Sequence, residues 1–124
     1  MDPEEKKIHM LLKSVIFYYH GLDEEERQNL EETANKLDAH HELKWAHKFI
    51  SEDYFTAFDR AREVLIDYIG DQKNNKRVEF IKMVWEANNL KGYVTEMETL
   101  AMIRLAQDWR VQDALSKLVL KHKY

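Results

Sequence analysis

Cysteine is absent from this chain of 124 residues, and glycine and proline are rare, with three and one occurrences. Without cysteine the protein has no disulfide, no thiolate zinc site and no cysteine nucleophile. Sheet proteins of this length need many turns, and turns recruit glycine and proline. The shortage of both residues therefore favours long helices joined by short polar corners.

Long apolar runs are also absent. No segment approaches the ~18 consecutive apolar residues of a membrane span. The start, Met1 to Lys7, is acidic and lacks the unbroken apolar stretch of a secretory signal. We therefore expect no transmembrane segment and a cytoplasmic location, with which the lack of cysteine is compatible.

The chain has no excess of basic charge, since 19 basic and 23 acidic residues give a net charge of −4. An acidic surface repels a phosphate backbone, so we expect no nucleic-acid binding. The one basic cluster comprises Lys117, Lys121, His122 and Lys123. Basic side chains near the end of a helix oppose the negative end of its dipole, and we expect that role for the cluster.

What the chain does contain is apolar residues, 44% of the total, at helical spacing. The length fits one domain over residues 1–124. We predict an all-α fold, a compact bundle of six or seven helices.

The first helix is expected to begin at Pro3, with Asp2 as N-cap, and to end at Gly21. Its apolar residues form a stripe that predicts burial on one face: Ile8, Leu11, Leu12, Val15, Ile16 and Tyr19.

Asp23 and Glu26 have the spacing of a capping box, so a second helix should begin there. We expect a break near Asp38. The residues expected to point inward from this helix and the next are Leu30, Ala34, Leu37, Leu43, Ala46, Phe49 and Ile50.

A fourth helix, with Ser51 as N-cap, is expected to end at Gly70 and to be central to the bundle because its apolar face is wide. That face comprises Phe55, Phe58, Ala61, Leu65, Tyr68 and Ile69. Residues 71–76 are polar, and form either a corner or the exposed first turn of the next helix.

The fifth helix should end at Asn88 and Asn89, and Thr95 with Glu98 forms a second capping box. The residues expected to point inward from the last three helices are Val78, Ile81, Val84, Trp85, Met102, Ala106, Trp109, Val111, Leu115, Leu118 and Val119.

A shift of 72 residues aligns the start of the chain with its end. Asp23 then meets Thr95, and Glu26 meets Glu98. Each half has the order helix, tight loop, capped helix, short helix, which predicts two pseudo-symmetric three-helix halves bridged by the fourth helix. The alternative is that any two amphipathic helices with capping boxes align this well.

The segment from Phe80 to Leu100 resembles the TerB-like, tellurite-resistance-associated helical domain. In that family an apolar helix runs into an acidic loop, followed by a Ser/Thr cap and a glutamate three residues on. Residues 15–37 resemble the same pattern more loosely. The resemblance implies a helical interaction domain whose acidic loops are the proposed ligands of a divalent metal.

The chain departs from that family in its loops. The loop aspartate is missing, and His20 stands before Gly21 in the first loop. Only Glu26 and Glu98 match the acidic positions of the family, so the resemblance implies these two as candidate metal ligands. The alternative is that both act only as capping residues.

The histidines lack the spacing of a metal site. His40 and His47 are seven residues apart, about 10 Å along a helix at 1.5 Å per residue, which is too far for one ion. The acidic run at 23–26 fits a helix start better than a calcium loop. We expect no other cofactor.

Tyr18 and Trp45 fall outside the apolar stripes, and exposed aromatics indicate a partner surface. The chain has no phosphate-binding loop or nucleophile motif, and carboxylates on helix surfaces titrate normally. We therefore expect that the protein is not an enzyme.

The prediction from the sequence is a TerB-like helical interaction domain in a bacterial stress-response or membrane-associated assembly, binding a protein partner or self-associating. The alternatives are an unrelated small helical adaptor or regulator of phage or plasmid type, and a divalent-metal-binding helical bundle.

Overall fold

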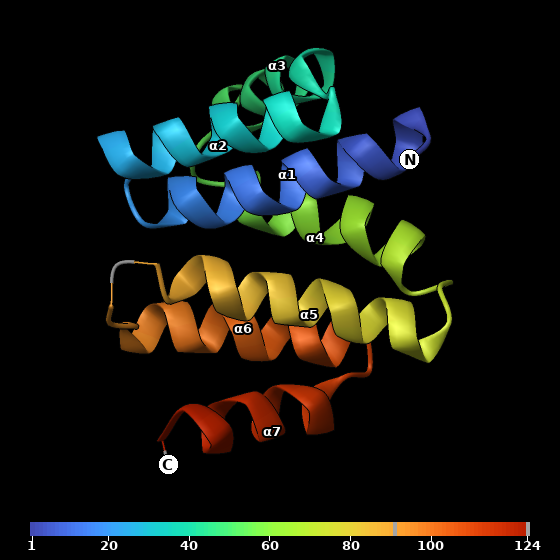
Figure 1. The fold of residues 1–124 in the computed structure, drawn as a ribbon, viewed down its shortest axis with the longest axis vertical. Helices are drawn as coiled ribbons and strands as arrows, with labels where there is room; N and C mark the ends of the chain where they lie inside the picture. The colour runs from blue at the N-terminus through green and yellow to red at the C-terminus, as the bar shows by residue number, and fades with distance from the viewer. Residues whose placement is uncertain (91, 124) are drawn as a thin grey trace. The chain divides into compact units, whose positions relative to one another are not determined.

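The structure is a computed structural model that describes residues 1–90 and 92–123. Within these residues the chain forms seven α-helices and no strand (Figure 1), which confirms the predicted all-α class. The helices are α1 (Pro3–Tyr19), α2 (Glu24–Leu37), α3 (His40–Ser51), α4 (Ala57–Ile69), α5 (Asn74–Asn88), α6 (Glu96–Asp108) and α7 (Gln112–Lys123). Among the described residues, no helix combines the length and the apolar character needed to cross a membrane.

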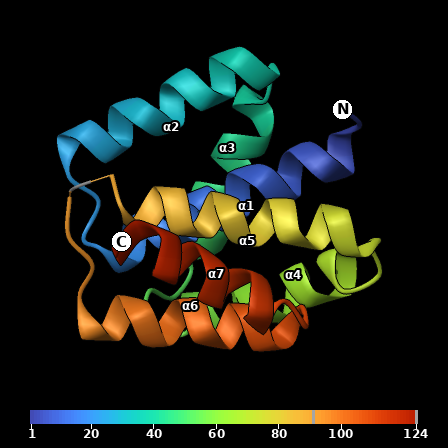
Figure 2. The same ribbon diagram turned by 60° about the horizontal axis from the view of Figure 1, so that its bottom comes forward.

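The chain divides into two compact units, Met1–Glu63 and Val64–Tyr124, and the division falls within α4. In the first unit α1, α2 and α3 pack against one another in all three pairs. In the second unit α5, α6 and α7 do the same, and Figure 2 shows α7 beside α5 and α6. Each unit therefore has the order helix, capped helix, short helix that the sequence predicts.

Helix α1 is buried around much of its circumference. The predicted stripe is inside, but Met10 and Phe17, which lie off it, are also 0% exposed. The prediction of burial on one face is wrong because α1 packs against both α2 and α3. Tyr19, the last position of the stripe, is 39% exposed instead, because it ends the helix beside the turn at Gly21.

The start of α4 also differs from the prediction. Ser51 belongs to the end of α3, and α4 begins only at Ala57, so Ser51 is not its N-cap. Phe55 was expected to face inward, but it precedes the helix and is 101% exposed. The reason is Arg60, whose guanidinium donates hydrogen bonds to the carbonyl oxygens of Phe49 (2.9 Å) and Asp53 (2.8 Å) and so holds residues 51–56 as a loop.

The start of the second helix has the same geometry in both units. In α2 the Asp23 carboxylate accepts a bond from the amide of Glu26, whose side chain accepts one from the amide of Asp23. Thr95 and Glu98 form the same reciprocal pair at the start of α6. Both predicted capping boxes are therefore confirmed.

The end of the second helix is repeated as well. Asp38 and Arg110, 72 residues apart, have left-handed backbones, with φ of 53° and 59°. In each unit the next amide, of Ala39 or Val111, donates a 2.8 Å hydrogen bond to the carbonyl of an alanine five residues earlier. The predicted break near Asp38 therefore has an equivalent in the second unit.

The core of the second unit includes Phe80, Ile81, Val84 and Trp109, with Trp109 at 0% exposure. Its last helix is buried less than expected. Leu115 is inside, Leu118 is half-buried, and Val119, which was predicted to point inward, is 41% exposed. Helix α7 has this open side because the groove described below separates it from α6.

Candidate functional site

Glu26 is buried, at 6% exposure, and both of its carboxylate oxygens have partners. Oε1 accepts the hydrogen bond from the Asp23 amide at 3.1 Å, and Oε2 lies 2.6 Å from Nδ1 of His20. The side chain of His20 is itself almost inaccessible, at 3% exposure. Glu26 thus joins the end of α1 to the start of α2, as the capping alternative predicts.

Glu98 is buried at 3% exposure, and its Oε1 accepts a 2.7 Å bond from the Thr95 amide. Glu26 belongs to the first unit and Glu98 to the second. No group of three histidine, aspartate or glutamate side chains positioned to hold a metal ion occurs among residues 1–90 and 92–123. Metal binding at Glu26 and Glu98 stays a prediction.

His40 and His47 have separate partners. Nε2 of His40 lies 2.5 Å from the Asn35 side-chain oxygen, and its Nδ1 lies 3.8 Å from a Glu31 carboxylate oxygen. His47 instead pairs with Tyr18. The structure therefore gives these two histidines local roles, in agreement with their spacing.

Tyr18, predicted to belong to a partner surface, is half-buried in an aromatic cluster. Its hydroxyl lies 3.0 Å from Nδ1 of His47, and its ring lies 5.8 Å from that of Tyr54. Burial lowers the pKa of His47 below 6.5 and raises the pKa of Tyr18, to which Tyr54 adds. Both shifts favour a neutral pair in which the hydroxyl donates to the imidazole.

Trp45, the other predicted surface aromatic, is also half-buried. Its ring lies 5.6 Å from that of Phe49, and Nζ of Lys7 lies 5.0 Å from the ring centre. These contacts give Trp45 a packing role between α1 and α3. Its contact with a partner stays a prediction.

The second unit contains a large apolar groove at α6, α7 and the end of α5. Its volume is about 650 Å³. The ring of Trp85 stands at its edge, 5.5 Å from that of His122. The apolar side chains that line it, which define the apolar groove, include Trp85, Tyr93, Met102, Ile103, Leu115, Val119 and Leu120.

Helix α6 carries an exposed apolar row next to this groove. Met97, Leu100 and Ile103 are 65%, 53% and 39% exposed, and they recur every three residues on one side of the helix. The equivalent positions of α2, 72 residues earlier, are Glu25, Gln28 and Glu31, all exposed. The two helices share their caps and their buried faces, so the outer face of α6 is apolar without a need of the fold.

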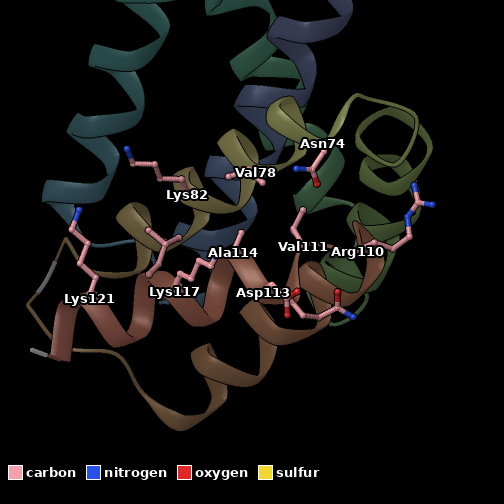
Figure 3. A pocket seen from close by; sticks show the side chains of 11 residues that line it. Asn74, Val78, Lys82, Arg110, Val111, Asp113, Ala114, Lys117 and Lys121 are labelled. Atoms are coloured by element: carbon pink, nitrogen blue, oxygen red, sulfur yellow. The ribbon is translucent and has the colours of Figure 1, made fainter.

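A second groove, the basic groove, lies between α5 and α7 and has a volume of about 770 Å³. Four cations and one carboxylate line it: Lys82, Arg110, Lys117, Lys121 and Asp113. Figure 3 shows the three lysines toward one end and Arg110 at the other. Helix α7 thus has an apolar groove on one side and a basic groove on the other.

Sequence reasoning missed both grooves and the row on α6. A signal for the row exists, because Met97, Leu100 and Ile103 are spaced at three residues and fall away from the inward-facing Met102 and Ala106. A helix apolar on two faces has either a second neighbour or an uncovered surface. The grooves themselves have no comparable signal, because side chains of separate helices form them.

The remaining question is whether other proteins share this arrangement. Comparisons with protein-family models, with curated proteins and with solved structures found no match to this chain. The TerB-like resemblance accordingly stays a prediction.

Proposed function

We propose that this chain is a helical protein-interaction module, and that its binding surface is the apolar groove with the row Met97, Leu100 and Ile103. The observation that carries the proposal is the contrast with α2, which has two glutamates and a glutamine at the equivalent positions. Large exposed apolar patches on a protein surface mark interaction sites.

A protein segment suits this surface better than a small polar ligand. The groove is open and is lined mainly by aliphatic and aromatic side chains, with few polar groups to orient a substrate. An amphipathic helix or an extended apolar segment binds such a groove by inserting a few large side chains. The absence of an assembled group of catalytic side chains here fits binding rather than chemistry.

The setting of this interaction is the finer part of the proposal. The TerB-like resemblance places it in a bacterial stress-response or membrane-associated assembly, on the capped segment around Thr95 and Glu98. A small adaptor of phage or plasmid type uses the same surface. Both settings make the same prediction for the groove, so the test addresses the groove first.

The test is affinity capture with two matched variants. Leu100→Glu places a charge on the apolar row, and Gln28→Glu places the same charge at the equivalent exposed position of α2. We expect a partner captured by the wild-type chain and by Gln28→Glu to be reduced at least tenfold with Leu100→Glu, because a carboxylate on the apolar surface must be desolvated. Far-UV circular dichroism serves as the folding control. Equal capture by all three proteins would contradict the proposal.

A further inference from the structure

The loop of residues 51–56, here the Phe55 loop, exposes two aromatic side chains. Tyr54 is 63% exposed and Phe55 is 101% exposed. Burying a phenylalanine side chain contributes about 1.5–3 kcal/mol relative to leaving it in water. A loop that holds this side chain in solvent leaves that free energy available for an interaction.

The Phe55 loop is held in place rather than left mobile. Arg60 donates to the carbonyl of Asp53 at 2.8 Å and, through Nε, to the hydroxyl of Thr56 at 2.9 Å. The Phe55 amide donates to the Asp53 carboxylate at 3.0 Å. A fixed loop loses little conformational entropy on binding, so it presents Phe55 in a form ready for a pocket.

The charges of the two units are complementary. Residues 1–63 contain 15 acidic and 9 basic residues, a net charge of −6, and residues 64–124 contain 8 and 10, a net charge of +2. Beside Phe55, the loop carries Glu52 and Asp53. Helix α7 carries Lys117 and Lys121 on the side next to the apolar groove. An acidic loop with an aromatic tip therefore matches an apolar groove with a basic border.

We propose that the apolar groove binds the Phe55 loop of a second copy of this chain. Phe55 and Tyr54 enter the groove between α6 and α7, and the acidic side chains beside them face the lysines of α7. The proposal rests on the proposed function, because it names the partner of the same surface. A volume of about 650 Å³ accommodates both aromatic side chains.

The experiment is sedimentation velocity over a range of protein concentrations on the full chain. We expect the wild type to self-associate, and Phe55→Ala and Leu120→Glu each to raise the dissociation constant at least tenfold. Both positions are exposed, at 101% and 57%, so neither change disturbs the core. Gln28→Glu, which adds the same charge at an exposed site, should associate like the wild type.

A mixture of the two variants tests the pairing itself. Phe55→Ala retains the groove and Leu120→Glu retains the loop, so the mixture forms one intact contact where each variant alone forms none. With one variant fluorescently labelled, we expect its sedimentation coefficient to rise when the other is added. A rise in NaCl from 0.05 to 0.5 M, on the order of these concentrations, should weaken wild-type association because it screens the charges.

Three results would overturn the proposal: a wild type that stays monomeric at all concentrations, variants that associate as the wild type does, or a mixture that does not associate. Failure of self-association is distinguishable from failure of the proposed function. A monomeric wild type that still captures a partner through Leu100 refutes only the second copy as occupant, whereas loss of the Leu100 effect on capture refutes the partner-binding role of the groove.

Discussion

The two units share a framework and differ in what they leave exposed. Each contains a capping box at the start of its second helix and a left-handed residue at the end, 72 residues apart. In the first unit the aromatic cluster around Tyr18 leaves a hollow of only about 80 Å³, whereas the apolar groove of the second unit measures about 650 Å³. The same local geometry therefore supports either a closed surface or an open one.

The difference between the third helices has a simple origin. Trp45 and Phe49 lie on the side of α3 whose equivalent positions in α7 are Lys117 and Lys121. In the first unit these aromatic rings pack 5.6 Å apart, while in the second unit the two lysines border the basic groove. Large side chains close the space between the first and third helices, and solvated lysines leave it open.

The largest effect that separates the units is expected at the end of the second helix. Trp109 is fully buried, whereas Leu37, its equivalent, is half-buried. Trp109→Ala should lower the free energy of unfolding of the second unit by about 3–5 kcal/mol because it leaves a cavity. Leu37→Ala should lower that of the first unit by about 1 kcal/mol. Urea denaturation with hydrogen exchange mass spectrometry measures each unit. Equal losses would break the comparison.

Acidification should affect the first unit specifically through His47. Because burial lowers its pKa below 6.5, the unfolded chain takes up a proton at this residue before the folded chain does. The contribution of His47 to stability is therefore full above pH 6.5 and is lost as the pH falls from there toward the lowered pKa. Protonation also removes the acceptor for the Tyr18 hydroxyl. His47→Gln should reduce the dependence of unfolding free energy on pH in this window, and an unchanged dependence would contradict the assignment.

The smallest effect concerns the two left-handed residues. Asp38→Gly should raise stability by about 0.5 kcal/mol, because glycine adopts this backbone without strain and the bond from Lys6 to the Asp38 carbonyl is retained. Arg110→Gly relieves similar strain but removes the 2.9 Å bond to the Gly70 carbonyl, so its net effect should be close to zero. Thermal unfolding of both variants measures the difference. A larger gain for Arg110→Gly would show that its hydrogen bond contributes little.

The sequence was sufficient for most helix boundaries. Asp2 and Pro3 start α1, the two capping boxes start α2 and α6, and Gly70 follows the end of α4. These features act within a few residues of chain, so their geometry does not depend on what packs nearby. The exception is Ser51, whose capping pattern was overridden by the hydrogen bonds of Arg60.

Only the tertiary structure decided which apolar residues are covered. Periodicity identified Phe55, Tyr19 and Val119 as inward-facing, yet all three are exposed, while Met10 lies outside the predicted stripe and is fully buried. Helical spacing groups residues on one face but does not say whether another helix covers that face. The row on α6, the groove beside α7 and the Phe55 loop depend on such coverage, because burial is a property of the neighbours that a side chain meets rather than of the side chain itself.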